Sequence, residues 1–409
     1  MSPTLARKMR AVRRAIHASP ELSHEETATA ALVRRELVAA GLREIEAVAG
    51  TGLVVTIRGP RDGRGLALRA DLDALPLAEA SSVPFASRRP GVMHACGHDA
   101  HTAILLGVAI ALHGQRERLR GSVRCVFQPA EEAEPLGARQ IVEAGHLKGI
   151  DAILALHVDP GIPVGQIGVR SGPLMACADS LRITIRGRGG HGAHPHLGVD
   201  AIAVAASVIQ EVQQIASRRI DPLEPMVLTI GKIEGGTAPN ILADHVVLEG
   251  IIRTLDERVR VRIREMIQDV VGGIARAHGA EGTVDVLPGE PVLRNDEALT
   301  DLIRGAVRDV LGPAALHEIP RPELIAEDFA FYLERVPGAM FRLGVGNPAK
   351  GIVHPLHHPG FALDEEALPI GAGVLLGAAW RFLEAGKVEP PDNRRRGAKA
   401  GGDTHATAH

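Results

Sequence analysis

Residues 181–185 read LRITI, in which apolar and polar side chains alternate as they do in a strand with one buried face. The residues that follow switch between helical and strand periodicity in a regular order. We expect helices over 200–217 and 256–278 and strands over 226–233, 245–253 and 283–287. These segments predict the order β-α-β-β-α-β, which is that of a ferredoxin-like α+β unit.

The sequence on either side of this unit predicts a different architecture. Before residue 180, buried-type strands are expected over 53–57, 66–70, 123–128 and 152–157 and helices over 25–40 and 102–112. The same α/β character returns after Pro291 and ends in a helix over 365–384. The predicted fold class is therefore α/β, a mixed-sheet domain with helices on both faces, plus an inserted ferredoxin-like α+β domain.

This organisation gives the chain four expected parts. The α/β domain would be built from residues 1–179 and 292–386, and the inserted domain from residues 180–291. Residues 387–409 are rich in Pro, Gly and charge, with almost nothing to bury, so a disordered tail is expected there. A simple tandem of three domains is the alternative organisation.

The composition excludes several classes of partner. Lys and Arg number 46 against 49 Asp and Glu, and a balance near zero gives no reason to expect nucleic acid or an anionic membrane surface as a partner. Seven Phe, one Trp and one Tyr are too few for base-stacking platforms. No stretch predicts a membrane span or a secretory signal, and an odd count of three Cys fits a reducing compartment, so we expect a cytoplasmic protein. The 19 His are unusual and suggest metal binding or proton transfer.

The strongest cluster of reactive side chains lies in GVMHACGHDAH, residues 91–101. Cys96 and His98 stand two residues apart on a glycine-rich loop that leads into the helix expected from Thr102. A helix N-terminus lowers the pKa of a nearby thiol and so favours the thiolate that binds metal. The alternative is a buried structural Cys with incidental polar neighbours.

Further candidate ligands follow the predicted strands. Glu131 and Glu132 come after the strand over 123–128, and His157 ends the next one, where open α/β sheets place their ligands. Two adjacent carboxylates can divide the work, one binding metal and the other acting as a general base.

Two other stretches could contribute to the same place. HPLHHPGF, residues 354–361, carries three His in a Pro/Gly loop, and the sequence alone does not choose among them. In RADLDALP, residues 69–76, Asp71 and Asp73 could bind metal, hold a ligand imidazole, or serve as turn residues. So many donors exceed one tetrahedral zinc and suggest two divalent ions, Zn or Mn, with Co or Ni possible.

These motifs resemble those of the aminoacylase/carboxypeptidase-like dinuclear metallopeptidases. The similarity is to the amidohydrolase branch, which contains hippurate hydrolases, N-acyl-amino-acid amidohydrolases and plant-type auxin-conjugate hydrolases. It covers about residues 5–385 and rests on RADLDALP, MHACGHDAH, FQPAEE, LHVDP, GRGGHGAHPH, GGTAPNIL, EDF and LHHPGF, in that order.

The resemblance implies a role for each matching residue. The implied metal ligands are Cys96, His98, Glu132, His157 and His357, with His358 as the neighbouring alternative to His357. Glu131 would be the general acid/base, and Asp71 would support the ligands from behind. The inserted domain would carry a homodimer contact and supply His191, Asn240 and Arg253 to the substrate.

The leading hypothesis is therefore a metal-dependent amidohydrolase that cleaves an N-acyl-L-amino acid, or a similar amide conjugate, into a carboxylic acid and an amino acid. A metal-bound water would attack the amide after giving its proton to Glu131. One alternative is a hydrolase that uses Cys96 as its nucleophile. Another is a non-catalytic small-molecule binding protein, against which the Glu131–Glu132 pair argues.

Overall fold

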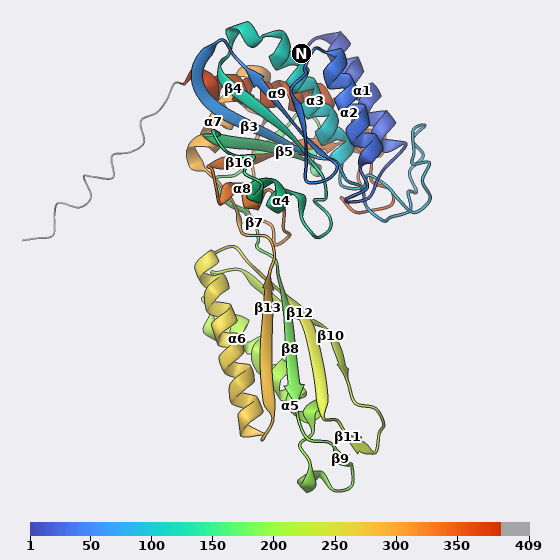
Figure 1. Ribbon diagram of the computed structural model, residues 1–409, viewed down its shortest axis with the longest axis vertical. Coiled ribbons are helices and arrows are strands. Elements are labelled where there is room, and N and C mark those ends of the chain that lie inside the picture. Colours follow the sequence, from blue (N-terminus) through green and yellow to red (C-terminus); the bar gives the residue numbers. More distant parts are fainter. Residues whose placement is uncertain (386–409) are drawn as a thin grey trace, which may run out of the picture.

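The computed structural model describes residues 1–385, and the tail expected over 387–409 lies outside them. Its larger unit is built on an eight-stranded sheet of order β1-β2-β4-β3-β5-β16-β6-β15 (Figure 1). The sheet is mixed, because β3, β4, β5 and β16 are parallel while β1 and β2 are antiparallel to their neighbours. The strands are β1 (Ile45–Val48), β2 (Gly52–Arg58), β3 (Arg61–Asp71), β4 (Arg120–Gln128), β5 (Ala152–Pro163), β6 (Ile167–Val169), β15 (Leu316–Glu318) and β16 (Gly338–Gly346).

Helices cover both faces of this sheet. In β3, Leu66 and Leu68 pack into one hydrophobic core while Ala67 packs into another, as the period of a strand requires. The first core also takes side chains from α1 (Pro3–His17), α2 (Thr27–Ala39), α3 (His98–Gly114), α7 (Glu297–Leu311) and α9 (Ala367–Glu384). The second takes them from α4 (Gly137–Glu143) and α8 (Ala330–Leu333), so the predicted fold class is confirmed for this part of the chain.

Among residues 1–385, one helix, α9, is long and apolar enough by composition to cross a membrane. It packs against α3 and α7, and residues such as Val374, Ala378 and Phe382 are fully buried there. A core helix of a folded domain passes the same test of length and hydropathy, and the packing of α9 gives it that role.

The inserted unit has the predicted element order. Its antiparallel sheet runs β10-β12-β8-β13, and α5 and α6 lie on one face of it (Figure 1). Leu181, Ile183 and Ile185 alternate along β8 and pack under the two helices, forming a core separate from those of the larger unit. The elements are β8 (Asp179–Arg186), α5 (Ala201–Gln214), β10 (Met226–Gly235), β12 (His245–Thr254), α6 (Glu257–Ala277) and β13 (Glu281–Pro288).

Two short strand pairs complete the fold. β9 (Gly190–His191) pairs with β11 (Ile241–Leu242) at the end of the inserted unit farthest from the large sheet (Figure 1). β7 (Gly172–Met175) pairs with β14 (Leu293–Asn295) close to the point where the chain passes between the two units.

A buried carboxylate ties together the two segments that join the units. Asp179, at the start of β8, accepts hydrogen bonds from Arg260 and Arg264 of α6. It also accepts one from the backbone N–H of Gly289, at 3.3 Å, on the segment that returns to the large sheet. Burial alone would raise the pKa of Asp179, but the bonds from the two arginines outweigh it and lower the pKa.

We expect Asp179→Asn to destabilise the protein by about 3 kcal/mol, because it leaves the buried Arg260 with only the exposed Glu257 as counter-charge. Chemical denaturation monitored by circular dichroism measures this. The carboxylate's contribution is present above its unfolded pKa near ~3.9 and is lost as the pH falls through the lower folded pKa. The variant should therefore lose less stability than the wild type on acidification. Glu249→Gln, which removes the carboxylate partner of the exposed Arg182 and Lys232, is the control and should cost less than ~1 kcal/mol.

Candidate metal centre

A cleft of about 820 Å³ opens between the large sheet and the base of the inserted unit. Its walls contain most of the residues to which the sequence assigned chemistry. From the larger unit come Cys96, Glu131, Glu132, His157 and His357, and from the inserted unit and its junction come Asp179, Arg253 and Glu290.

The Cys96 loop leads into α3 earlier than the sequence predicted. The helix begins at His98 rather than at Thr102, so His98 lies in its first turn and not in the loop. Gly97 precedes it with a φ of 84°, and a Cβ there would lie 2.4 Å from Cγ2 of Val158. Only glycine allows this backbone to turn so close to β5, and the turn brings Cys96 and His98 together.

One carboxylate holds two of the predicted ligands. His98 Nδ1 lies 3.0 Å from the Asp73 carbonyl oxygen and 3.2 Å from Asp73 Oδ1, and a carbonyl can only accept, so Nδ1 carries the hydrogen. Asp73 Oδ2 accepts from the backbone N–H of Glu132 at 2.9 Å. His98 Nε2 is thereby left free to bind a metal, and Asp73 acts behind the ligands rather than as one.

Glu132 points its carboxylate at the imidazoles. Oε1 lies 3.2 Å from His357 Nε2 and 3.9 Å from His98 Nε2. Within residues 1–385, Glu132 Oε1 and His98 Nε2 are nevertheless buried without any hydrogen-bond partner. Buried polar atoms are rarely left unsatisfied, and donors that converge without bonding to one another are what a cation site requires.

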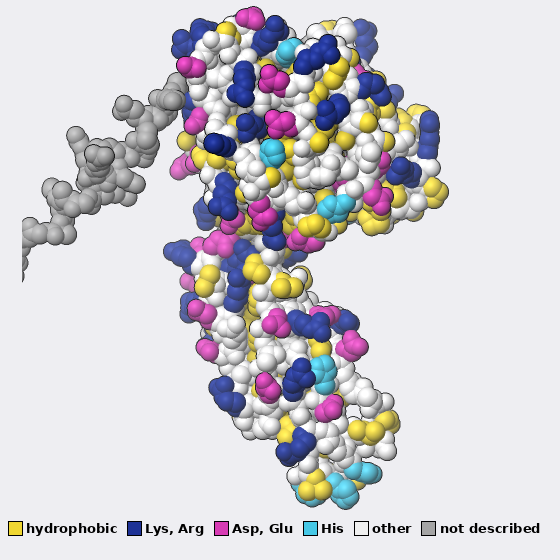
Figure 2. Space-filling model, in the orientation of Figure 1, with side chains coloured by type: hydrophobic (Ala, Val, Ile, Leu, Met, Phe, Trp, Pro, Cys, Tyr) yellow, Lys and Arg dark blue, Asp and Glu magenta, His cyan; other side chains and the backbone are white. Residues whose placement is uncertain are grey.

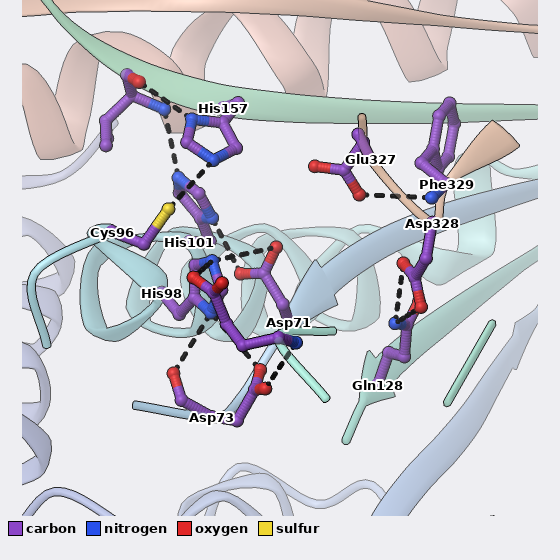
Figure 3. Close-up of polar contacts among 12 residues, drawn as sticks. Asp71, Asp73, Cys96, His98, His101, Gln128, His157, Glu327, Asp328 and Phe329 are labelled. Carbon is purple, nitrogen blue, oxygen red and sulfur yellow. Dashed lines mark hydrogen bonds and ion pairs between the residues drawn. The ribbon is translucent and has the colours of Figure 1, made fainter. Parts of the chain in front are cut away.

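His157 and Cys96 face each other across the same space. His157 Nε2 lies 3.5 Å from Cys96 Sγ, while its Nδ1 donates to the carbonyl of Val158 at 2.8 Å (Figure 3). The bond to the carbonyl of Val158 places the ring hydrogen of His157 on Nδ1. Nε2 is then the nitrogen that faces the thiol of Cys96.

The two adjacent histidines in the loop over residues 354–361, His357 and His358, have different surroundings in the structure. His357 has a φ of 58°, donates its backbone N–H to Ala95 and directs its ring at Glu132. His358 accepts from the N–H of Gly360, and its ring stacks on His354 with centroids 4.3 Å apart. His357, and not His358, stands at the candidate metal centre.

The donor atoms fit two divalent cations rather than one. They form overlapping groups whose ligand atoms lie within 4.8 Å of one another, and Cys96 and His98 each belong to two groups at this centre. Thiolate, imidazole and carboxylate together suit Zn and its first-row neighbours. The groups are Cys96, His98 and His157; Cys96, Glu132 and His357; and His98, Glu131 and Glu132.

His101, from the same motif, has a different role. Its Nδ1 lies 2.7 Å from Asp71 Oδ1 and its Nε2 accepts the backbone N–H of Val158 at 2.9 Å (Figure 3). Both nitrogens are engaged, so His101 joins the end of β3 to the middle of β5 instead of binding metal. Asp71 is completely buried, accepts from Arg69 at 2.7 Å and has its Oδ2 3.7 Å from His98 Nε2.

Glu131 lies in a strongly acidic environment. Burial and then the neighbouring Glu327 and Glu132 raise the pKa of Glu131 well above its usual value. Arg69 offsets part of this charge, since its Nη2 lies 3.0 Å from Glu327 and 2.7 Å from Asp328. The sequence motif EDF contained this acidic pair, but its place beside Glu131 depends on a contact across the sheet that no local pattern shows.

The structure does not bring His191 and Asn240 to the cleft of the same chain. Both lie at the far tip of the inserted unit, where His191, His194 and His196 are exposed and histidine gathers on the surface (Figures 1 and 2). Arg253 does line the cleft, and its buried Nη1 has no hydrogen-bond partner among residues 1–385. Of the three residues expected to meet substrate, one chain therefore positions only Arg253.

Comparison with known proteins matches this arrangement to a family. The model of peptidase family M20/M25/M40 matches residues 67–381. The chain belongs to this family. The resemblance to dinuclear metallopeptidases is thus confirmed. The protein is a hydrolase, and its family membership supports amide hydrolysis and the binding of two metals.

Individual relatives cover nearly the whole chain. N-acetyl-L-cysteine deacetylase of Bacillus subtilis is 42% identical over 383 residues, which are 93% of this chain and 90% of that protein. Thermostable carboxypeptidase 2 of Saccharolobus solfataricus is 40% identical, covering 88% of this chain and 92% of its own. Among solved structures, a dinuclear metal binding peptidase of the M20 family from Bacillus subtilis has a TM-score of 0.82 and 35% identity, covering 94% and 99%.

Replacing Cys96 tests the metal centre directly. Cys96→Ser should weaken metal binding, because serine offers a harder and more weakly acidic donor, and added metal should restore part of the activity. Metal content after dialysis against a graded chelator series measures the effect. Cys125→Ser, at a buried thiol in β4 outside the cleft, should keep both metals. An acyl-thioester trapped on Cys96 would instead show that this residue is a nucleophile.

Proposed function

We propose that this protein is an amidohydrolase that cleaves N-acyl-L-amino acids, or similar amide conjugates, into a carboxylic acid and an amino acid. The observation that carries the proposal is that one cleft contains both a group of candidate metal ligands and Arg253. His98 Nε2 and Glu132 Oε1, beside Glu131, and Nη1 of Arg253 are all buried without a hydrogen-bond partner among residues 1–385. Relatives named as a deacetylase and as a carboxypeptidase support an amide as the bond that is broken.

Cys96, His98, Glu132, His157 and His357 would hold two divalent cations, with Zn or Mn favoured and Co or Ni as alternatives. When bound, such cations polarise a carbonyl and lower the pKa of water to near neutrality. Glu131 is the group that moves the proton: as a carboxylate it accepts one from the attacking water, and as an acid it donates one to the leaving nitrogen. Burial, and then the neighbouring Glu327 and Glu132, raise the pKa of Glu131, which favours the acid form that donates to the leaving nitrogen.

Arg253 would read the free carboxylate of the amino acid. It lies near the end of β12 and lines the same cleft as the metal ligands. A planar guanidinium suits a carboxylate through two parallel hydrogen bonds. The unpartnered Nη1 of Arg253 supports this assignment, since a bound carboxylate would satisfy it.

His191 and Asn240 would act in the cleft of a second copy of the chain. The edge strand β10 of the inserted sheet offers a surface for pairing, and exposed Ile233 and Ile241 lie near the same tip. A homodimer formed through the inserted unit would carry His191 to the partner's substrate, where it would stabilise the developing oxyanion.

The two alternative functions have less support. Burial raises the pKa of Cys96 to about 12, so without a cation this thiol is a poor nucleophile near neutral pH. A binding protein would not need the adjacent carboxylates of Glu131 and Glu132 at a group of candidate metal ligands. We also propose a cytoplasmic location, which the three free, buried cysteines support.

The proposed function is tested by a hydrolysis screen of N-acyl-amino acids in which the acyl and amino parts vary separately. Zn, Mn, Co and Ni are each supplied to metal-stripped protein, and free amino acid is measured. Metal-dependent release from at least one N-acyl-amino acid is expected, with loss of activity on chelation. Turnover unaffected by chelation would refute the proposal.

The adjacent glutamates should respond differently to the same change. Glu131→Gln should keep both metals and lower kcat by about 10²–10⁴-fold, the usual contribution of a general base. Glu132→Gln should instead lose metal, because an amide is a weaker ligand than a carboxylate. Metal analysis and steady-state kinetics separate the two effects. Glu134→Gln, an exposed carboxylate in the same loop, is the matched control and should change neither.

Arg253→Ala should lower kcat/KM by the equivalent of about 1.5–3 kcal/mol, the scale of a charged hydrogen bond. The loss should vanish for substrates whose α-carboxylate is blocked as an amide or ester. Arg182→Ala, an exposed arginine on β8, should leave both substrate types unaffected. Equal losses from Arg253→Ala on free and blocked substrates would mean that the carboxylate is read elsewhere.

A further inference from the structure

We infer that Glu26, a buried residue at the start of α2, is a positioning residue that sets the direction of Glu131 and Glu132 by holding the backbone of Ala130. This inference rests on the proposed function for its kinetic consequences, but its effect on metal binding can be measured without any substrate. None of the sequence motifs pointed to Glu26.

The need for such a support comes from the backbone at Ala130. Ala130 has a φ of 47°, in the left-handed region that residues with a Cβ rarely occupy, and it immediately precedes Glu131. A conformation of this kind costs on the order of 1 kcal/mol and persists only where the surroundings enforce it. It turns the chain sharply after β4, and the turn aims the two glutamates into the cleft.

Glu26 supplies the enforcing contact. Its Oε1 accepts the backbone N–H of Ala130 at 2.8 Å, and its Oε2 accepts the hydroxyl of Thr51 at 2.5 Å. The carboxyl group is completely buried, and burying it is costly unless its hydrogen bonds are made. On the other side, the carbonyl of Ala130 accepts from the N–H of Gly137 at 2.8 Å, so both polar backbone groups of this residue are held.

The local structure shows that Glu26 is not required for its own helix. Glu26 occupies the N-cap position of α2, where a side chain usually accepts from the first free N–H groups, but it makes no such bond. Glu21 does this instead, through bonds to the N–H groups of Ala28 and Thr29 at 3.1 and 2.7 Å. The carboxylate of Glu26 is thereby available for Ala130, on a different part of the chain.

A second carboxylate holds the other side of Glu131. Asp73 accepts the N–H of Glu132 at 2.9 Å and also the hydroxyl of Ser23 at 2.7 Å. The amides that flank Glu131 on either side are therefore both fixed by buried carboxylates. Because Ser23 and Glu26 belong to the same short segment, this segment supports the pair of glutamates from behind the cleft.

The inference is tested with Glu26→Ala and Glu26→Gln, alone and combined with Ala130→Gly. Glu26→Ala should lower kcat by ~10²-fold with KM little changed, and weaken metal binding by ~10–100-fold, as misplaced catalytic groups and lost outer contacts do. Glu26→Gln keeps an acceptor oxygen for Ala130 and should recover most of both. Ala130→Gly, which adopts positive φ without strain, should restore part of the kcat of Glu26→Ala.

Thr51→Val is the matched control, because it removes the other hydrogen bond of Glu26 and leaves the contact with Ala130 intact. It should lower the melting temperature while kcat and metal affinity stay within about twofold. Metal affinity is measured by competition of Zn²⁺ or Mn²⁺ with a chromogenic chelator, and kcat with the best substrate of the screen.

Two outcomes would overturn the inference. In the first, Glu26→Ala lowers stability as Thr51→Val does but leaves metal affinity and kcat unchanged. In the second, Glu26→Ala is impaired and neither Glu26→Gln nor Ala130→Gly recovers any of the loss. If the wild type cleaves no amide while Glu26→Ala still weakens metal binding and Glu26→Gln restores it, the proposed function fails and the role of Glu26 stands.

Discussion

The parallel pairing of β3 with β4 and β5 is the constraint on which the candidate centre depends. In this register Asp71 lies opposite Gln128, and Arg69 lies opposite Ala155, so β3 and β4 end beside the middle of β5. Asp73 and Glu132, which follow these two ends, therefore meet His157, which lies within β5, although the three are distant in sequence. Open α/β sheets place their ligands at such strand ends for the same geometric reason.

Charge balance is the second physical feature of the centre. Arg69 is completely buried and lies within ion-pair distance of three carboxylates, Asp71, Glu327 and Asp328. One arginine cannot neutralise these three together with Glu131 and Glu132, and uncompensated buried charge is costly. Divalent cations held by the unpartnered donors would supply the missing positive charge, so metal binding would contribute to stability as well as to catalysis.

Much of the fold could be predicted because its strands and helices are long and periodic. The element order of the inserted unit and the helices near residues 27–39 and 367–384 match the structure closely. The predicted start of α3 at Thr102 was wrong. A glycine usually interrupts a helical pattern, but here Gly97 is the left-handed residue directly before the helix. The sequence analysis assigned no boundaries to α7 or β16, although it expected α/β structure after Pro291.

Some of the candidate site residues could likewise be predicted from the sequence, and others could not. Glu132, which follows the end of β4, was predictable from local pattern together with the resemblance. His157 was also singled out, but the expectation that it ends its strand was wrong, because β5 continues to Pro163. The different roles of His98 and His101 could not be predicted. They depend on which ring nitrogen faces Asp73, Asp71 or Val158. Glu26 gave no sign at all in the sequence, since adjacent glutamates before a helix usually serve as solvated or capping residues.

The insertion within the large sheet also has a consequence for how the chain folds during synthesis. β16 lies between β5 and β6, yet it is made only after all of β8–β13 has been made. The inserted unit has its own core and contains every strand of its main sheet, so it can fold as soon as it has emerged from the ribosome. Until residues 338–346 follow, the edge of β5 has no neighbour, and the growing chain exposes an apolar strand that chaperones recognise and that can aggregate.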